Sequence, residues 1–527
     1  MTPLSQATVL GDVLRGHSQL HPAKVAVETL DGRSVTFAQL NSRVNSLVAS
    51  VSTVGISKGA RVAILARNMP EYLEVFGLAK AGIVVVPLNW RLTSAEIAKL
   101  LAHCEAELVF VDHAHLQVAS GLRSGAPSVR HWVSIGAAAG DGWIPYESLI
   151  ASGTDEEPSA DVGPADVCCL IYTSGTTGAP KGVAITHASV LGNARTSAGE
   201  VLRLSPNDRT LSVMPMFHAG GMWYHFFPSI AAGCTTLLLP GFEAATVLRA
   251  LISHRITNVH LVPTMISALL ALPQVQAANL SALRLLFYAA SSMPAELLRR
   301  AMQALPRCEF VQSYGSTEGG MVSVLDMQAH RQAREPASEH LLLSCGKPCA
   351  QREVRIVGAA GAVLASREIG ELEVRSPDMM LGYWHNPDAT AVVLQSGWLK
   401  TGDLGYADEE GYLYIVDRKN DMIITGGENV YPTEVEGVLY RDPAVQDAAI
   451  FGIPDPVWVE KVVAAVVLKP GTPATEQEII DRTRARLAGY KCPKAVYFVS
   501  SLPKNGAGKV LRAELRRQFA ERCAGGK

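Results

Sequence analysis

Residues 172–182, Y-T-S-G-T-T-G-A-P-K-G, form a run of glycines and hydroxyl side chains with many groups that could bind a ligand. Glycine-rich turns free backbone N–H groups, and hydroxyl and ammonium groups bind phosphate oxygens. An apolar run at 167–172 leads into it and predicts a strand. The run is not a G-x4-G-K-[ST] loop, because Pro180 takes the place of the second glycine. The candidate phosphate ligands are Thr173, Ser174, Gly175, Thr176, Thr177, Gly178 and Lys181.

A second loop at 312–320, Q-S-Y-G-S-T-E-G-G, presents an aromatic ring, a hydroxyl and a carboxylate between glycines. Tyr314 could stack on a base, Thr317 could bind a phosphate oxygen, and Glu318 could hold Mg²⁺. A simple turn is the alternative interpretation of this loop taken alone.

Three polar segments follow: T-G-D at 401–403, D-R-K-N-D-M-I-I-T-G-G-E-N-V-Y-P-T-E at 417–434, and P-K-N-G-A-G-K-V-L-R at 503–512. Taken singly they are ambiguous. Asp403 could cap a turn, and Arg418 and Lys509 could be ordinary surface charges.

Together, in this order and with this spacing, the five segments resemble the adenylate-forming superfamily of acyl-CoA synthetases, amino-acid adenylation domains and beetle luciferases. The resemblance extends from about Thr36 to Arg512. It implies an ATP-dependent, AMP-forming ligase that uses Mg²⁺ and joins a carboxylic acid to coenzyme A through an acyl-AMP.

The resemblance also implies roles for the residues quoted above. The 173–182 loop would handle the leaving pyrophosphate, Tyr314 would lie beside adenine, Thr317 would contact the α-phosphate, and Glu318 would hold Mg²⁺. Asp403 would bind both ribose hydroxyls with help from Arg418. Lys509 would bridge the acid and the α-phosphate, which suits the physics: an anion attacking another anion needs positive charge on both sides.

The family rotates its small C-terminal domain between its two half-reactions. The hinge falls on Asn420, where family members usually carry Asp or Lys, and asparagine tolerates unusual backbone angles. After the rotation, Gly427, with Gly426, would line the path of the pantetheine arm.

Four segments, near 218, 262, 288 and 314, match the family's acyl pocket. His218, in M-P-M-F-H-A-G-G, falls beside the acyl carboxylate. Apart from Glu318, these segments contain no Asp, Lys or Arg, so diacids and amino acids are disfavoured. The candidate pocket residues are Trp223, Tyr288, Ala289, Ala290 and Met321.

We therefore expect an apolar monocarboxylic acid, first of all a fatty acid of medium to long chain. The alternatives are an aryl or hydroxycinnamate acid, or an acyl carrier protein in place of coenzyme A. Ala289 stands where fatty-acid members usually have glycine, which would narrow the pocket and favours shorter chains or aryl groups.

The elements that must position these residues follow from the hydrophobic pattern. Apolar runs at 61–65, 82–88 and 107–112 alternate with helical stretches at 71–81 and 93–103, which is typical of parallel sheets covered by helices. From Glu353 short alternating strands predict a distorted antiparallel unit. The predicted fold is α/β, with a large N-terminal domain over 1–420 and a small α+β domain over 421–527, which the resemblance implies is mobile.

Composition excludes other classes. The 527 residues carry 47 Lys and Arg against 49 Asp and Glu, so a nucleic-acid partner is not expected. No apolar run approaches the ~18 residues of a membrane span, and no secretory signal is evident, so we expect a cytoplasmic enzyme with reduced cysteines. A homodimer is common in the family, but nothing in the sequence indicates one.

The chain also contains G-I-S-K-G at 55–59, which matches the G-x-S-x-G pattern of serine hydrolases. That motif needs a strand before it and a helix after it, whereas here the strand candidate follows. We therefore treat the match as chance.

Overall fold

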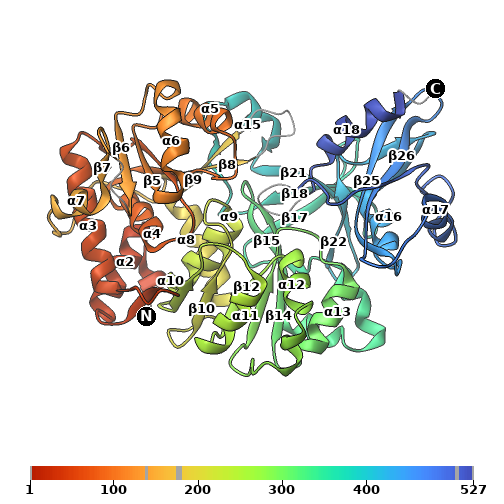
Figure 1. Ribbon diagram of the computed structural model, residues 1–527, viewed down its shortest axis with the longest axis horizontal. Coiled ribbons are helices and arrows are strands. Elements are labelled where there is room, and N and C mark those ends of the chain that lie inside the picture. Colours follow the sequence, from red (N-terminus) through yellow and green to blue (C-terminus); the bar gives the residue numbers. More distant parts are fainter. Residues whose placement is uncertain (1–2, 137–139, 174–180, 505–509, 525–527) are drawn as a thin grey trace.

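The computed structural model describes residues 3–136, 140–173, 181–504 and 510–524, which form four β-sheets. Two of the sheets are mainly parallel, and both belong to the larger N-terminal part (Figure 1). The third is antiparallel, and the fourth belongs to the smaller C-terminal part. The mixed α/β architecture predicted from the sequence is confirmed.

The first parallel sheet has the strand order β19-β9-β8-β4-β3-β5-β6-β7. Its strands are β3 (Arg61–Leu65), β4 (Val84–Pro87), β5 (Leu108–Asp112), β6 (His131–Ile135), β7 (Ile144–Pro145), β8 (Val167–Thr173), β9 (Lys181–Thr186) and β19 (Gly382–Tyr383). Strands β8, β9 and β19 pair antiparallel to one another, and β4 is buried along its whole length. The predicted strand over 61–65 matches β3, because an unbroken apolar run favours a strand buried on both faces.

The second large sheet has the order β16-β15-β14-β13-β12-β10-β11-β1-β2. Its strands are β1 (Val25–Thr29), β2 (Ser34–Thr36), β10 (Arg209–Ser212), β11 (Thr235–Leu238), β12 (Asn258–His260), β13 (Leu285–Tyr288), β14 (Glu309–Ser316), β15 (Gly320–Leu325) and β16 (Lys347–Pro348). The pairs from β1 through β11, β10, β12 and β13 to β14 are parallel. Their carboxyl ends therefore lie at one edge of the sheet, where α/β proteins bind ligands.

Helices cover these sheets and fill the space between them. They are α1 (Pro3–Gln6), α2 (Leu10–Leu20), α3 (Phe37–Thr53), α4 (Pro70–Phe76), α5 (Ser94–Cys104), α6 (Leu116–Leu122), α7 (Tyr146–Ala151), α8 (His187–Arg195), α9 (Ala219–Gly221), the π-helical turn η5 (Met222–Phe226), α10 (Phe227–Ala231), α11 (Ala244–Ser253), α12 (Pro263–Leu270), α13 (Ala295–Ala304) and α14 (Met327–Gln332). The helix predicted over 93–103 begins where expected. The Thr93 hydroxyl accepts a hydrogen bond from the Glu96 backbone N–H, and the Glu96 carboxylate accepts one from the Thr93 backbone N–H.

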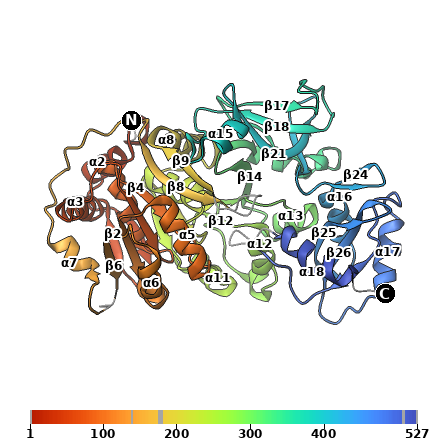
Figure 2. The ribbon, with the colours of Figure 1, turned by 90° about the horizontal axis from the view of Figure 1, so that it is seen from above.

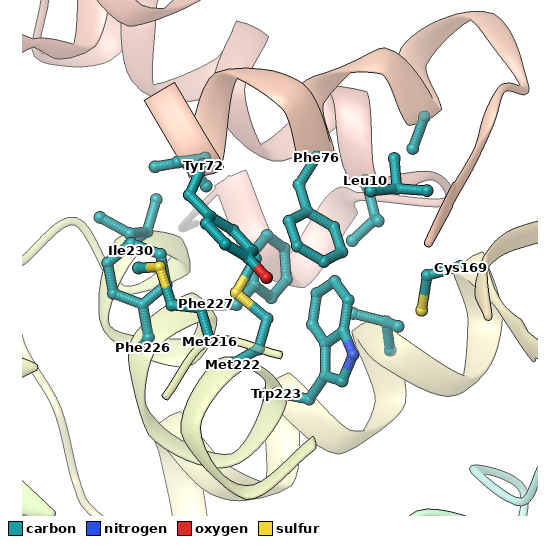
Figure 3. Packing of buried hydrophobic residues seen from close by; sticks show 14 of the residues in the cluster. Leu10, Tyr72, Phe76, Cys169, Met216, Met222, Trp223, Phe226, Phe227 and Ile230 are labelled. Atoms are coloured by element: carbon teal, nitrogen blue, oxygen red, sulfur yellow. The ribbon is translucent and has the colours of Figure 1, made fainter. Parts of the chain in front are cut away.

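The largest hydrophobic cluster lies between the two large sheets and contains side chains of both. Figure 3 shows part of it: Phe76 from α4 packs edge-on to Trp223 from η5, with ring centroids 5.2 Å apart. The predicted helix over 71–81 is α4 followed by a 3-10 turn over Gly77–Ala81. A Cβ on Gly77 would lie 2.5 Å from Val44, so this contact requires glycine.

The antiparallel sheet contains β17 (Glu353–Val357), β18 (Gly370–Arg375), β20 (Leu394–Gln395), β21 (Trp398–Ala407) and β22 (Leu413–Arg418), beside α15 (Pro387–Val393). The C-terminal sheet contains β23 (Ile423–Thr425), β24 (Glu428–Val430), β25 (Val445–Asp455), β26 (Val459–Leu468) and β27 (Val496–Phe498), with α16 (Pro432–Leu439), α17 (Glu476–Arg484) and α18 (Arg512–Ala524). The boundary predicted at 420/421 lies between β22 and β23, which belong to different sheets.

Two other expectations can be compared with the structure. The G-I-S-K-G segment follows α3 and precedes β3, the reverse of the order that a serine nucleophile needs. No helix among the described residues is long and apolar enough to cross a membrane.

Candidate active site

The candidate site lies where β14, β15 and β19 meet the antiparallel sheet. Viewed from above, β21 lies beside β14, with β18 and β17 beyond it, and the C-terminal part lies to one side of them (Figure 2). The described candidate ligands for nucleotide, metal and phosphate come from the β14–β15 hairpin, from β21 and β22, and from the ends of β8 and β9.

The β14–β15 hairpin presents Thr317 and Glu318 at its turn. A Cβ on Gly315 would lie 2.2 Å from the Gly320 carbonyl oxygen, and Gly320 has φ +69°, so both positions require glycine. The Ser316 hydroxyl accepts a 2.9 Å hydrogen bond from the Gly319 backbone N–H. The loop is thus a tightly closed hairpin that holds Thr317 and Glu318 half-buried.

The structure brings Tyr314, Asp403 and Arg418, the three candidate nucleotide ligands, into one contiguous group. Asp403 on β21 lies opposite Arg418 on β22, and Arg418 Nε lies 2.5 Å from Asp403 Oδ1. The Tyr314 hydroxyl donates to Asp403 Oδ2 over 2.5 Å. Burial raises the pKa of Tyr314 well above its usual value, and the Asp403 carboxylate raises it further. The group therefore presents a buried carboxylate that is held by Tyr314 at one oxygen and by Arg418 at the other.

Tyr383 lies between two charged side chains of the site, Glu318 and Lys181. The sequence analysis did not identify this tyrosine. Its hydroxyl donates a 3.0 Å hydrogen bond to Glu318 Oε1, and the ammonium of Lys181 lies 4.8 Å from its ring centroid. The same segment pairs with β9, because the Leu381 backbone N–H donates to the Ala184 carbonyl over 2.9 Å. The only sequence signal was the aromatic pair that follows Gly382.

His218 precedes α9 in a largely apolar setting. Its ring lies 4.4 Å from that of Phe217, and its Nε2 atom is buried without a hydrogen-bond partner among the described residues. Burial lowers the pKa of His218 to about 4, and the nearby Arg91 charge acts in the same direction. Arg91, which stacks 4.4 Å from the Trp90 ring, comes from the N-terminal block. The four acyl segments gave no sign of this positive charge.

Three of the five predicted pocket residues lie in one cluster, and the other two do not. Trp223, Ala289 and Met321 are buried in the cluster between the large sheets. Asn193 links two of them, because its amide donates to the Trp223 carbonyl over 2.8 Å and accepts from the Met321 backbone N–H over 3.2 Å. Tyr288 belongs to the other cluster, with its hydroxyl 2.9 Å from His330 Nε2. Ala290 is exposed at φ +73°.

Several predicted residues lie outside the described residues or at their edges. Ser174, Gly175, Thr176, Thr177, Gly178 and Lys509 are outside them. Thr173 ends β8 and Lys181 begins β9, and the two are paired across the strands. Asn420 lies in the turn between β22 and β23, and Gly427 has φ +85° in the β23–β24 turn.

The donor set suits a magnesium ion that binds together with a nucleotide. Among the described residues no group of three or more His, Cys, Asp or Glu side chains is placed to hold a metal. Mg²⁺ commonly takes one or two carboxylates and completes its shell with substrate phosphates and water. The single Glu318 carboxylate, next to the end of the predicted phosphate loop, fits that pattern.

Comparison with known proteins agrees with this geometry. The AMP-binding enzyme family matches residues 14–384, and the AMP-binding enzyme C-terminal domain matches residues 434–509. This chain belongs to the AMP-binding enzyme family. The ligase is 39% identical over 490 residues to a feruloyl-CoA synthase of Amycolatopsis sp, covering 93% of this chain and 94% of that protein.

Other relatives differ in the acid they are named for. A long-chain-fatty-acid–CoA ligase of Mycobacterium tuberculosis is 34% identical, covering 97% of this ligase and 98% of that protein. The crystal structure of an anthranilate CoA ligase in complex with anthranoyl-AMP superimposes with a TM-score of 0.90 at 29% identity, covering 99% and 100% of the two chains. The ligase is therefore an AMP-forming acyl- or aryl-CoA ligase that uses ATP and coenzyme A.

Proposed function

We propose that this ligase forms the coenzyme A thioester of an aromatic monocarboxylic acid of the hydroxycinnamate kind. The observation that carries the proposal is the closed aromatic wall at Trp223. Its indole packs edge-on against Phe76 and Phe227, with centroids 5.2 and 5.5 Å away. Behind these rings, against α2 and α4, lies a cavity of about 20 Å³, which is room for about one water molecule. An aryl ring can pack against such an aromatic wall.

The expectation of a medium- to long-chain fatty acid becomes the alternative. It is favoured by the similarity to a fatty-acid ligase. The similarity to a feruloyl-CoA synthase at higher identity favours the aromatic acid. A carrier protein as the thiol acceptor is a further alternative that the assay below addresses.

In the first half-reaction a carboxylate oxygen of the acid attacks the α-phosphorus of ATP, and pyrophosphate leaves. Asp403 and Arg418 would orient the ribose, and Tyr314 would lie beside the adenine. His218 would lie beside the acid, and as a neutral imidazole it can donate a hydrogen bond to the carboxylate without adding a charge. Glu318 would hold Mg²⁺, which neutralises charge on the phosphates. Lys181 and Thr317 would contact the phosphates.

In the second half-reaction the thiol of coenzyme A attacks the acyl carbonyl, and AMP leaves with the bonding electrons. We propose that the C-terminal domain, residues 421–527, rotates about Asn420 between the two steps. Gly427 would then line the path of the thiol arm. Lys509→Ala should abolish adenylation and leave the conversion of supplied acyl-AMP largely intact; an equal loss of both steps would contradict this role.

The test is AMP release from ATP and Mg²⁺ over a panel of acids, each with and without coenzyme A. The panel is 4-coumarate, ferulate, benzoate, octanoate, palmitate and malonate. A maximum of kcat/KM at coumarate or ferulate that depends on coenzyme A supports the proposal. A maximum at octanoate or palmitate overturns it in favour of a fatty-acyl ligase. Pyrophosphate release without turnover of coenzyme A would point to a carrier protein.

A further inference from the structure

His260, the last residue of β12, is buried, and neither ring nitrogen makes a hydrogen bond of good geometry with the described residues. Its exposed fraction is 1%. Burial holds its pKa well below the usual value, and the neighbouring His225 acts in the same direction, against the opposing effect of the Gly220 backbone. The imidazole is therefore neutral at physiological pH, with one donor and one acceptor nitrogen. Most buried polar atoms in proteins have a partner, so a ring that only the Gly220 backbone approaches requires an explanation.

The neighbouring buried polar side chains have partners, so His260 differs from them. His225 Nε2 lies 2.9 Å from Asn258 Oδ1, and the Thr210 hydroxyl donates to the same oxygen over 3.1 Å. The Thr210 hydroxyl also lies 3.0 Å from that of Ser229. A connected polar network thus lies beneath η5 and α10, next to one imidazole that has no partner.

Gly220 leaves room for one methyl-sized group beside His260. Apart from its own helix and chain neighbours, a Cβ added to Gly220 would have only His260 Cε1 within 4 Å, at 3.9 Å. Gly220 lies in α9, two residues after His218, which is the candidate contact of the substrate carboxylate. The Phe287 ring lies 4.5 Å from that of His260 and supplies an apolar wall. Aromatic wall, free space and unpartnered imidazole therefore occur together beside the acid-binding loop.

We propose that His260 binds a hydrogen-bonding substituent of the substrate, in the first instance a phenolic hydroxyl. This inference rests on the proposed function, since it names a group on the same aromatic acid. A hydroxyl can donate to one ring nitrogen, or accept from the other, where the described residues provide no hydrogen bond of good geometry. An unsubstituted ring would leave the imidazole unpaired and would lose that interaction.

The inference makes His260 a specificity-determining residue. A site built to hydrogen-bond a substrate hydroxyl discriminates strongly against the analogue that lacks it, because the buried protein group then remains unpaired. For one neutral hydrogen bond we expect a preference of about 10-fold or more in kcat/KM. If an apolar residue replaces the histidine, the pocket should no longer distinguish the hydroxylated acid from the analogue that lacks the hydroxyl.

The experiment compares 4-coumarate with cinnamate, which lacks only the hydroxyl, in the wild type, His260→Leu and His260→Gln. We expect the wild type to favour 4-coumarate by about 10-fold or more. His260→Leu should bring the ratio close to one by losing kcat/KM on 4-coumarate alone. Because its amide can still donate and accept, His260→Gln should retain part of the preference.

Three results would overturn the inference. They are a wild type that does not distinguish the acids, a ratio unchanged in His260→Leu, and an equal loss on both acids, which would mark His260 as purely structural. The proposed function fails separately, if neither aromatic acid is activated while octanoate is. The same variants then test His260 through the ratio of 8-hydroxyoctanoate to octanoate, with the same criteria.

Discussion

The hydroxyl of Tyr383 donates a 3.0 Å hydrogen bond to Glu318 Oε1, while Lys181 lies 4.8 Å from the ring of the same tyrosine. One side chain thus contacts the carboxylate proposed to hold Mg²⁺ and the cation at the end of the phosphate loop. Main-chain hydrogen bonds hold the segment around Tyr383 on both sides. The Met380 N–H donates to the Glu318 carbonyl over 2.8 Å, and the Trp384 N–H donates to the Gly182 carbonyl over 2.7 Å. Tyr383 is therefore placed to hold the two charged groups at a constant separation.

Tyr383→Phe removes the hydrogen bond and keeps the ring beneath Lys181. A hydrogen bond to a charged group contributes about 1.5–3 kcal/mol, so we expect adenylation to fall by about one to two orders of magnitude. The Mg²⁺ concentration for half-maximal rate should rise, because Glu318 loses its orienting contact. Calorimetric titration of Mg·ATP into the enzyme supplies a readout that is independent of turnover.

Tyr440→Phe is the matched control. The Tyr440 hydroxyl donates to Asp447 Oδ1 over 2.8 Å within the C-terminal domain, so the same chemistry is removed elsewhere. An identical Mg²⁺ dependence in Tyr383→Phe and the wild type would contradict the assigned role.

The family could be predicted from the sequence because its motifs are local. The T-E pair at 317–318 needs only a closed hairpin, and the glycines that close it lie within the same segment. The capping box at Thr93 is likewise complete within four residues. The residues of each of these motifs are close together in the chain, so a single sequence is enough to identify the motif.

The contacts that complete the site could not be predicted, since they join distant segments. Tyr383 and Glu318 are 65 residues apart, and Arg91 reaches His218 from the other large sheet. The face of the sheet on which the Tyr288 side chain lies also could not be predicted from the sequence. Strand β13 reads L-L-F-Y and is buried on both faces, so no polar alternation shows which side chains face the acyl site.

Asp403→Asn should damage nucleotide binding more than Tyr314→Phe. Asp403 has an exposed fraction of 4% and is the charged acceptor of the group, whereas Tyr314 supplies one donor to it. We expect a rise in the KM for ATP of at least an order of magnitude in Asp403→Asn and a smaller rise in Tyr314→Phe. Steady-state kinetics with varied ATP measure both; the reverse order would show that the tyrosine, and not the carboxylate, dominates ribose binding.

His218 should act as a neutral imidazole throughout the physiological range. Burial lowers its pKa to about 4, so it carries a proton on both nitrogens only below that pH. The ratio of wild-type to His218→Asn activity should therefore stay constant between about pH 5.5 and 8. A pH–rate profile of each protein measures this ratio, and a sigmoid near the ordinary histidine value of ~6.5 in the wild type alone would contradict it.

Arg352→Met should destabilise the ligase in a pH-dependent way. Arg352 donates to the Asp378 carboxylate and, over 3.2 Å, to the Met321 carbonyl in the acyl wall. Both charged side chains are buried. Breaking a buried pair leaves one uncompensated charge and costs about 3–5 kcal/mol. The remaining Asp378 carboxylate becomes neutral when it takes up a proton, which removes the cost of the unpaired buried charge.

The sign of the pH dependence follows from the Asp378 pKa. Burial raises it to about 6 although Arg352 opposes the shift, so removing Arg352 raises it further. The unfolded chain releases this proton near the ordinary value of ~3.9, whereas the folded variant retains it to higher pH. The free energy of unfolding of Arg352→Met therefore falls as pH rises through the folded pKa.

Urea unfolding at pH 5.5 and pH 8 measures this difference, with Arg352→Met losing more relative to the wild type at pH 8. Arg367→Met is the control, because Arg367 pairs with Glu409 on the surface and both side chains are exposed. Its unfolding midpoint should match the wild type at both pH values. A loss in Arg352→Met that is equal at the two pH values would show that the hydrogen bond to the Met321 carbonyl, and not the unpaired Asp378 charge, determines the stability of this wall.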